Sequence, residues 1–266
     1  MPSAELKAAL EAAQAAAELI RGFYRRNLEI RTKADQTPVT EADVQAEELI
    51  RALLTERFPG YGFYGEETGR HDCAAESLWL VDPIDGTKSF VRHCPFFSTQ
   101  IALMRAGHLV LGVSSAPAYG ELAWAETGAG AYLNDSPIRV STTAGLSESF
   151  VSTGNLKTLA RAPQWRDLGE LVSRVSRIRG YGDFVHYNLL ARGALDAVIE
   201  SDVDILDIAA LTVIVREAGG TFTDLAGAEV TLNTTSVLAS NGPLHAPILA
   251  ALAWAESGPD TAALRP

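Results

Sequence analysis

Cysteine and positive charge are both scarce in this sequence, and each shortage excludes a class of protein. Only two of the 266 residues are cysteine, Cys73 and Cys94, and they do not form a CxxC pair. A disulfide framework or a structural zinc site is therefore not expected, and a reducing cytoplasm is the compartment that fits best. The chain carries 33 Asp and Glu against 22 Lys and Arg, a formal net charge of −11. Because nucleic acids and anionic membranes are usually bound by a basic face, neither is an expected partner.

Long hydrophobic runs and the common nucleophile motifs are also missing. The longest apolar stretches, such as APILAALAWA from Ala246, are too short for a bilayer, which takes about 20 residues. The first residues, MPSAELKAALEAAQAAAELIRGF, form an alanine-rich helical pattern with charged residues and do not predict a signal peptide. A GxSxG elbow, an HExxH helix and a GxxxxGK(S/T) loop are absent, and the five histidines are scattered. We therefore expect a soluble protein whose chemistry needs no histidine nucleophile.

The remaining pattern alternates helices and strands in a chain that is 47% hydrophobic, which is typical of a globular protein with a substantial core. Residues 96–134 predict a strand meander, and a polar stretch at 140–148 marks a boundary between two lobes. We expect an N-terminal α+β lobe over residues 1–142 and a C-terminal α/β lobe over residues 143–266. Helices are predicted at 3–25, 41–58, 164–178, 184–195 and 205–220, and further strands within 60–69, 77–82, 149–155 and 196–201.

Two aspartates follow an apolar strand in the segment LWLVDPIDGTKSF. Asp82 and Asp85 lie where the chain leaves the sheet, with Pro83 stiffening the exit and Gly86 allowing a close approach of the backbone. Carboxylates this close repel and raise the pKa of one unless a cation is present, and oxygen-only clusters suit Mg²⁺. The backbone amides of Gly86 and Thr87 could then hold phosphate oxygens. The alternative is a plain turn, since Asp, Pro and Gly are common turn formers.

Three further acidic segments have structural as well as functional interpretations. Glu66 and Glu67 follow the short strand GFY, again at a strand exit, but adjacent glutamates are usually solvated. Asp43 stands three residues after Thr40 in PVTEAD, a spacing typical of a helix capping box. Asp207 lies near the start of a predicted helix and could merely cap it. Taken singly, none of these acids identifies a site.

Taken together, these segments resemble the inositol monophosphatase superfamily of magnesium-dependent phosphatases. Lys33 with PVTEAD, then GEE, WLVDPIDGTKSF and ILDIAALTVIVREAGG match its pattern in the same order and with similar spacing over nearly the whole chain. The resemblance implies an α+β fold, the layered αβαβα sandwich of inositol monophosphatase and fructose-1,6-bisphosphatase. It also implies hydrolysis of a small phosphate monoester with bound Mg²⁺, and a homodimer, because relatives are commonly dimeric.

The resemblance assigns roles to individual residues of this chain. The metal ions would be held by Glu66, Asp82, the backbone carbonyl of Ile84, Asp85 and Asp207. Glu66 would also take part in catalysis, and Thr87 with Asp43 would orient or deprotonate the attacking water. The amides of Gly86 and Thr87 would receive the phosphate. One position departs from the pattern, because many members carry tryptophan before the last metal-binding aspartate and this chain has Leu206.

The substrate prediction depends on two further acids. Within the superfamily, DPIDGTKSFVR and GYGDF look most like the bacterial histidinol-phosphate phosphatases, which tend to have an aspartate at the position of Asp183 where inositol-directed relatives have a small residue. Asp183 and Glu200 would then receive the ammonium and imidazolium groups of histidinol phosphate through charge-assisted hydrogen bonds. The structural alternative is that Asp183 caps a helix starting near Phe184 and that Glu200 is an ordinary strand-end acid.

Other substrates and one non-enzymatic role stay open. Inositol 1-monophosphate is the next candidate, followed by a 3'(2'),5'-bisphosphate nucleotide and by fructose bisphosphate. A nucleotide substrate would need a basic or aromatic cluster for its base, and no such cluster is obvious in the sequence. Some proteins of this fold also bind transcription machinery or RNA, so an interaction module is the alternative from another class. The set of acids and the negative charge disfavour that role.

Overall fold

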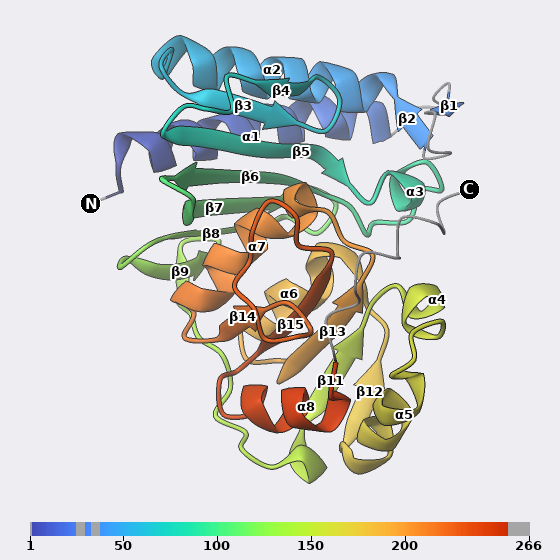
Figure 1. The fold of residues 1–266 in the computed structure, drawn as a ribbon. Helices are drawn as coiled ribbons and strands as arrows, with labels where there is room; N and C mark the ends of the chain where they lie inside the picture. The colour runs from blue at the N-terminus through green and yellow to red at the C-terminus, as the bar shows by residue number, and fades with distance from the viewer. Residues whose placement is uncertain (1, 25–29, 33–37, 255–266) are drawn as a thin grey trace.

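The computed structural model describes residues 2–24, 30–32 and 38–254, and their elements stack in five layers (Figure 1). Two long helices cover one face of an eight-stranded sheet. Two more helices fill the space between that sheet and a five-stranded sheet, and further helices cover the outer face of the second sheet. The predicted α+β fold and its αβαβα layers are therefore confirmed.

The first sheet has the strand order β10-β9-β8-β7-β6-β5-β3-β4. Its strands β3 and β5 run parallel, and its other neighbouring pairs are antiparallel. The predicted meander is present as β6 to β9. The strands are β3 (Gly62–Gly65), β4 (Gly69–His71), β5 (Ser77–Asp85), β6 (Ser98–Arg105), β7 (His108–Ala116), β8 (Glu121–Glu126), β9 (Gly130–Leu133) and β10 (Ser136–Ile138).

Helices α1 (Ala4–Tyr24) and α2 (Glu41–Arg57) pack on each other and on the outer face of this sheet. The buried face of α1 is largely alanine, which favours the helix and lets the neighbouring backbones come close. A two-stranded sheet of β1 (Ile30–Thr32) and β2 (Pro38–Thr40) leads into α2, and the short helix α3 (Thr87–Phe90) follows β5.

The second sheet has the order β12-β11-β13-β15-β14. Strand β11 runs parallel to both β12 and β13, and the other pairs are antiparallel. The strands are β11 (Phe150–Thr153), β12 (Arg177–Arg179), β13 (Ala197–Ser201), β14 (Thr221–Thr223) and β15 (Ser236–Ser240). The 3-10 helix η1 (Leu146–Glu148) precedes β11, and the outer helices are α4 (Leu156–Leu159), α5 (Trp165–Arg174) and α8 (His245–Leu252).

Helices α6 (Asp183–Ala191) and α7 (Ile205–Glu217) form the middle layer. Helix α7 approaches β7 so closely that a Cβ added to Gly112 would lie 2.3 Å from the carbonyl oxygen of Ala210. Only glycine allows this contact between helix and strand. Because the first turn of α7 carries Asp207, the same packing sets the position of that carboxylate over the first sheet.

Two predicted helices are shorter in the structure. The helix expected over 164–178 ends at Arg174, and Arg177–Arg179 instead pair with β11 as strand β12. The helix expected over 184–195 begins at Asp183 and ends at Ala191, before Gly193, which adopts a positive φ of 75°. The strand pairing of β12 is a long-range contact that the local spacing of apolar residues does not reveal.

The helices of the middle layer contact both of the lobes that the sequence predicts. They come from the second half and pack in one core with strands of both sheets. The boundary at residues 142 and 143 stays a prediction. Within the described residues, no helix combines the length and hydropathy needed to cross a membrane.

Gly112→Ala is expected to destabilise the protein by about 1–3 kcal/mol, because the added methyl group must push α7 away from β7. Gly22→Ala is the matched control, since its Cβ would meet nothing within 4 Å on helix α1 and alanine favours a helix. Thermal unfolding of both variants measures the difference. Equal melting temperatures would contradict the close packing of helix and strand.

Candidate active site

A bulge in β5 turns Asp82 and Asp85 toward the same point. Asp82 pairs with Gln100 and Asp85 pairs with Ser98, so three steps along β5 match two steps along β6. In a regular strand, side chains alternate between faces, and residues three apart would point to opposite sides. The extra residue of the bulge shifts the alternation by one, so that Asp82 and Asp85 point to the same side. Pro83 is tolerated in the bulge because it has no N–H to donate to a neighbouring strand. Both carboxylates therefore lie on one side of the sheet.

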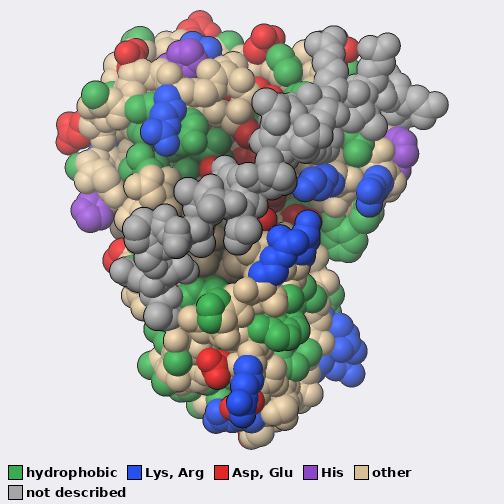
Figure 2. Space-filling model, turned by 45° about the vertical axis from the view of Figure 1, so that its right-hand side comes forward, with side chains coloured by type: hydrophobic (Ala, Val, Ile, Leu, Met, Phe, Trp, Pro, Cys, Tyr) green, Lys and Arg blue, Asp and Glu red, His purple; other side chains and the backbone are tan. Residues whose placement is uncertain are grey.

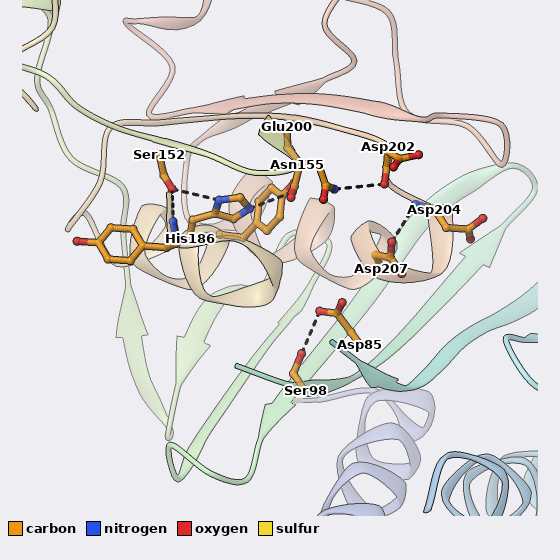
Figure 3. A network of polar contacts seen from close by, with 11 residues as sticks. Asp85, Ser98, Ser152, Asn155, His186, Glu200, Asp202, Asp204 and Asp207 are labelled. Carbon is orange, nitrogen blue, oxygen red and sulfur yellow. Dashed lines mark hydrogen bonds and ion pairs between the residues drawn. The ribbon is translucent and has the colours of Figure 1, made fainter. Parts of the chain in front are cut away.

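Asp207 completes a cluster with these two aspartates. One carboxylate oxygen from each of Asp82, Asp85 and Asp207 lies within 4.8 Å of the others. Figure 3 shows Asp207 above Asp85, each reaching from its own element. Glu66 is hydrogen-bonded to Asp82 and interacts electrostatically with the other two aspartates. The four carboxylates predicted to bind metal thus come from three separate segments of the chain and meet in one place.

Burial and mutual repulsion raise the pKa values in this cluster. Asp82 and Asp85 are 2% and 8% exposed, and burial followed by the neighbouring carboxylates holds the pKa of each well above its ordinary value. Burial also raises the pKa of Asp207 to about 7, with further repulsion from nearby acids. Buried like charges are unfavourable unless a cation neutralises them, and oxygen ligands suit a hard divalent ion. The residues present therefore fit a divalent metal ion.

Backbone amides orient two of these carboxylates. Asp82 Oδ1 accepts the N–H of Ile84 at 2.9 Å, and Asp207 Oδ2 accepts the N–H of Asp204 at 2.9 Å. The second contact is half of a capping box in which Asp204 is the N-cap of α7 and Asp207 its third residue. Asp207 therefore does take part in capping the helix, and the cap fixes where its carboxylate points.

Asp85 is oriented by side chains of the neighbouring strand. Its Oδ2 accepts the hydroxyl of Ser98 at 3.4 Å (Figure 3), and Gln100 Nε2 donates to Ser98 Oγ at 2.7 Å. Ser98 and Gln100 are fully buried on β6, on the same face as the acids. The bulge therefore brings the carboxylate and its donor together.

Asp43 and Thr87 form a polar pair beside the cluster. Asp43 Oδ2 accepts the N–H and the hydroxyl of Thr40, at 2.7 and 2.6 Å, which completes the predicted capping box of α2. The Thr87 hydroxyl lies 3.2 Å from Asp43 Oδ1 and 3.0 Å from the carbonyl oxygen of Ile84. Burial raises the pKa of Asp43, the hydrogen bonds from Thr40 oppose the shift, and repulsion by Glu66 adds to it. The capping role therefore leaves one oxygen of Asp43 directed at the site.

The loop that carries Glu66 is fastened to a buried acid on α2. Glu47 is fully buried, and its two oxygens accept the N–H groups of Glu67 and Thr68 at 2.8 and 2.7 Å. A Cβ at Gly65 would lie 2.4 Å from the Glu47 carboxylate, so only glycine leaves room for it. This contact sets the direction in which the chain presents Glu66.

Gly86 begins the short helix α3 with a left-handed φ of 88°, and a Cβ there would lie 2.5 Å from the carbonyl oxygen of Phe96. Both facts require glycine. The first N–H groups of a helix have no partner within it, which leaves the amides near Thr87 available. Their role in binding phosphate stays a prediction, and Lys33 lies outside the described residues.

The two acids predicted to bind substrate lie near the cluster. Asp183 and Glu200 both act electrostatically on Asp85 and raise its pKa. Burial, followed by repulsion from Glu200, raises the pKa of Asp183 to about 6. Asp183 does not cap α6, because the N-cap is Gly182 and has no side-chain cap hydrogen bond. Glu200 is 4% exposed and lies within strand β13. Asp183 is therefore not the helix cap that its structural alternative expected, and the binding of substrate by Asp183 and Glu200 stays a prediction.

The charges around the site differ in sign from its centre. Figure 2 shows acidic side chains where the upper and lower parts of the molecule meet, with Lys and Arg side chains on both sides of them. Lys88 on α3 is close enough to Asp183 to lower its pKa, against the effects of burial and Glu200. A basic rim attracts an anion toward an acidic centre that a cation can neutralise.

Residues that orient the acids were missed by sequence reasoning. They are Glu47, Ser98, Gln100 and Asp204, together with Ser152, His186 and Tyr187 near Glu200. Glu47 gave a usable signal, because it shares the helical spacing of the buried Ile50 and Leu54 on α2. The contacts of the others depend on strand register and helix packing, which their local sequence does not reveal.

Comparison with known proteins gives matches over almost the whole chain. Residues 1–257 match the inositol monophosphatase family. The chain is 41% identical over 254 residues to a protein named histidinol-phosphatase from Mycobacterium tuberculosis, covering 93% of this chain and 97% of that protein. It is 37% identical over 249 residues to one of the same name from Chlorobaculum parvum, covering 93% and 96%. The crystal structure of the extragenic suppressor protein suhB from Bartonella henselae superposes with a TM-score of 0.87 at 32% identity, covering 94% of this chain and 98% of that one.

Asp82→Asn and Asp207→Asn are each expected to weaken the binding of Mg²⁺ or Mn²⁺ by at least about a hundredfold, since loss of a group that only orients a metal ligand already costs about 10- to 100-fold. After chelation neither variant should be less stable, because the amide removes repulsion. Titration calorimetry and thermal unfolding measure the two quantities. Asp135→Asn, in an exposed turn between β9 and β10, is the control. Unchanged affinity in both site variants would contradict the cluster as a metal site.

The raised pKa of Asp207 predicts the pH dependence of stability in the chelated protein. Its pKa is about 7 in the folded chain against an ordinary value of 3.8, so between these values the folded state binds more protons than the unfolded state. The free energy of unfolding therefore falls as the pH rises through this window. In EDTA, the melting temperature should fall from about pH 5 to about pH 8, and should fall less in Asp207→Asn. Identical pH profiles for the two proteins would rule out this linkage.

Proposed function

The chain belongs to the inositol monophosphatase family, and from this premise we propose that it hydrolyses L-histidinol phosphate to L-histidinol and inorganic phosphate with the help of Mg²⁺. Hydrolysis of a phosphate monoester is supported by the family match and by a cluster of acids that fits a metal ion. Histidinol phosphate is supported by the two relatives that carry that activity in their names.

The observation that carries the substrate assignment is the pair Asp183 and Glu200 beside the metal cluster. Both carboxylates are close enough to Asp85 to raise its pKa. A phosphate held at the cluster would leave the rest of the substrate facing these two acids. Histidinol offers an ammonium group and an imidazole ring there, and a carboxylate binds such cations more strongly than it binds neutral hydroxyl groups. A cationic alcohol is therefore the leaving group that this pocket favours.

The ion would be held by the carboxylates of Glu66, Asp82, Asp85 and Asp207 and by the carbonyl oxygen of Ile84. When bound, Mg²⁺ neutralises the phosphoryl oxygens and lowers the pKa of water. The free oxygens of Asp82 and Asp207 suit this role, because their other oxygens are already fixed by backbone amides. Glu66 contributes a charge from a separate loop and belongs to the same reaction centre.

Asp43 and Thr87 are proposed to orient and deprotonate the attacking water. The single hydroxyl proton of Thr87 can go either to Asp43 Oδ1 or to the carbonyl of Ile84. If that carbonyl held a cation, the Thr87 hydroxyl would donate to Asp43. Its lone pairs would then accept a hydrogen bond from the water, and as the water proton moves to Thr87 Oγ1 the hydroxyl proton passes to Asp43. The raised pKa of Asp43 makes it a stronger base than an ordinary aspartate, which suits a group that takes up a proton. The water oxygen then forms the new bond to phosphorus as the bond between phosphorus and the ester oxygen breaks, and the leaving oxygen takes a proton from solvent.

Phosphate binding is assigned to the amides of Gly86 and Thr87. The left-handed conformation of Gly86 starts α3 directly after the metal-binding segment of β5. This places the amides next to Asp85 in the chain, where the phosphoryl group would need donors.

We further assign the enzyme to histidine biosynthesis, to the cytoplasm and to a homodimeric state. The compartment is supported by the low cysteine content, with Cys73 and Cys94 both free thiols. The substrate is a small phosphorylated metabolite and the net charge of −11 disfavours nucleic acid. Gel filtration with light scattering tests the dimer.

A release assay for inorganic phosphate tests the function. L-histidinol phosphate, inositol 1-phosphate and 3'-phosphoadenosine 5'-phosphate are compared with Mg²⁺ present. We expect the highest kcat/KM for histidinol phosphate. A higher kcat/KM for inositol 1-phosphate would show that inositol 1-phosphate is the preferred substrate and that histidinol phosphate is not. No release from any ester by protein that binds Mg²⁺ would overturn the hydrolase assignment.

Asp183→Asn is expected to raise KM for histidinol phosphate by about tenfold, because a hydrogen bond to a charged group contributes about 1.5–3 kcal/mol. The KM for 4-nitrophenyl phosphate, which carries no cation, should stay the same. Asparagine is the preferred replacement because residue 183 has a left-handed φ of 46°, a conformation that Asn adopts more readily than Ala. An equal rise in KM for the two substrates would show that Asp183 does not contact the cationic part of histidinol phosphate.

A further inference from the structure

The carboxylate of Glu200 is held on one side by two donors that converge on a single oxygen. His186 Nε2 lies 3.0 Å from Glu200 Oε2, and the Tyr187 hydroxyl donates to the same oxygen at 2.6 Å. Both donors come from α6, and their side chains are 0% and 1% exposed. Burial, followed by the charge of Glu200, keeps the pKa of Tyr187 well above its ordinary value, so its hydroxyl keeps the proton that it donates. The two contacts therefore fix the orientation of the carboxylate.

A chain of hydrogen bonds defines which nitrogen of His186 carries a proton. The backbone N–H of Tyr181 donates to Ser152 Oγ at 3.2 Å, and Ser152 Oγ lies 3.2 Å from His186 Nδ1 (Figure 3). With one lone pair of the serine engaged, its own proton is free to go to Nδ1. With Nδ1 accepting from Ser152, the imidazole carries a proton on Nε2, which faces Glu200. His186 Nε2 and the Tyr187 hydroxyl thus both donate to Glu200 Oε2.

The second oxygen of Glu200 occupies a space that only glycine leaves open. A Cβ at Gly154 would lie 1.9 Å from Glu200 Oε1. The position of Gly154 is itself fixed, since its N–H donates to the carbonyl oxygen of Ile199 at 3.1 Å as β11 and β13 run side by side. The glycine thus defines where Oε1 can lie.

We propose that His186 and Tyr187 are positioning residues that direct Glu200 Oε1 toward the cationic part of the substrate, with Gly154 providing the space that this orientation needs. The proposal rests on the proposed function, in which Glu200 contacts the organic part of the phosphate ester. Held in this way, the side chain does not have to be ordered when substrate binds, and an ordered partner binds more tightly. The three residues therefore determine specificity and leave the chemistry at phosphorus to the metal cluster.

The test compares two replacements of His186 that differ in which nitrogen they keep. His186→Gln places an amide nitrogen near the former Nε2 and can still donate to Glu200, whereas His186→Asn reaches only the former Nδ1. We expect His186→Asn to raise KM for L-histidinol phosphate about tenfold, with kcat within about twofold, and His186→Gln to recover most of the loss. The KM for 4-nitrophenyl phosphate should stay unchanged in both. An equal loss on both substrates, or no rescue by glutamine, would overturn the proposal.

Two further variants keep the test decisive if the His186 variants do not fold. Tyr187→Phe removes only the hydroxyl and keeps the ring that stacks on Phe222 with centroids 5.6 Å apart. Gly154→Ala displaces Oε1 and leaves both donors in place, and Gly60→Ala is its control because its Cβ would meet nothing within 4 Å. Both site variants should raise KM for histidinol phosphate selectively, and Gly60→Ala should not. Unchanged KM in both site variants would refute the positioning role.

A double-mutant cycle separates this inference from the proposed function. In a Glu200→Gln background, His186→Asn should have little additional effect on KM, because its effect passes through Glu200. The proposed function fails if the wild-type enzyme prefers an ester whose alcohol part carries no positive charge, such as inositol 1-phosphate. The double-mutant cycle is then measured with that ester. If the effects of the His186 and Glu200 substitutions on KM are not additive, the positioning role is upheld, and if they are additive, it is refuted.

Discussion

Repulsion between carboxylates is the constraint on which the rest of this structure depends. Asp82, Asp85 and Asp207 bring ligand oxygens within 4.8 Å of one another, and Glu66 adds a fourth charge. Buried like charges either take up protons or bind a cation, which is why the pKa values of the three aspartates are raised. A phosphate ester is itself an anion and is repelled until the cation is bound. A bound ion would therefore relieve the repulsion between the carboxylates and, by neutralising them, would allow the anionic substrate to bind.

The fold holds these charges with backbone features more than with flexible side chains. A bulge in β5 gives Asp82 and Asp85 one direction, a capping box fixes Asp207, and a second capping box fixes Asp43. Close packing at Gly112 then sets the distance between α7 and the sheet. Features of this kind keep their geometry when the charge of the site changes, because their hydrogen bonds are part of the strands and helix ends. The carboxylates can therefore keep their positions when an ion or a phosphate binds and when it is released.

The parts of this protein that are predictable from its sequence are those with local causes. Helices α1, α2 and α7 follow from apolar spacing, the meander from its glycines, and the capping role of Asp43 from its distance to Thr40. Long-range pairing produced the failures: residues 177–179 have helical spacing but pair with β11 as a strand. The partners of Glu200 were missed for the same reason, because Ser152 lies 34 positions from His186 in the chain and meets it only through the packing of α6 on β11. Register and packing are properties of the whole fold, and no local pattern encodes them.

Two groups of carboxylates lie near each other in this protein, and the way each is held decides what it binds. The aspartates of the metal cluster turn their free oxygens toward one another. One oxygen of Glu200 accepts from His186 and Tyr187 and the other lies beside Gly154, so the carboxylate cannot turn toward the cluster without breaking the contacts with both donors. An acid held in this way does not compete with Asp85 for the ion. In the proposed function, a positive group on the substrate would then be recognised at a set distance from phosphorus, and the residues that select the ester would be separate from those that hydrolyse it.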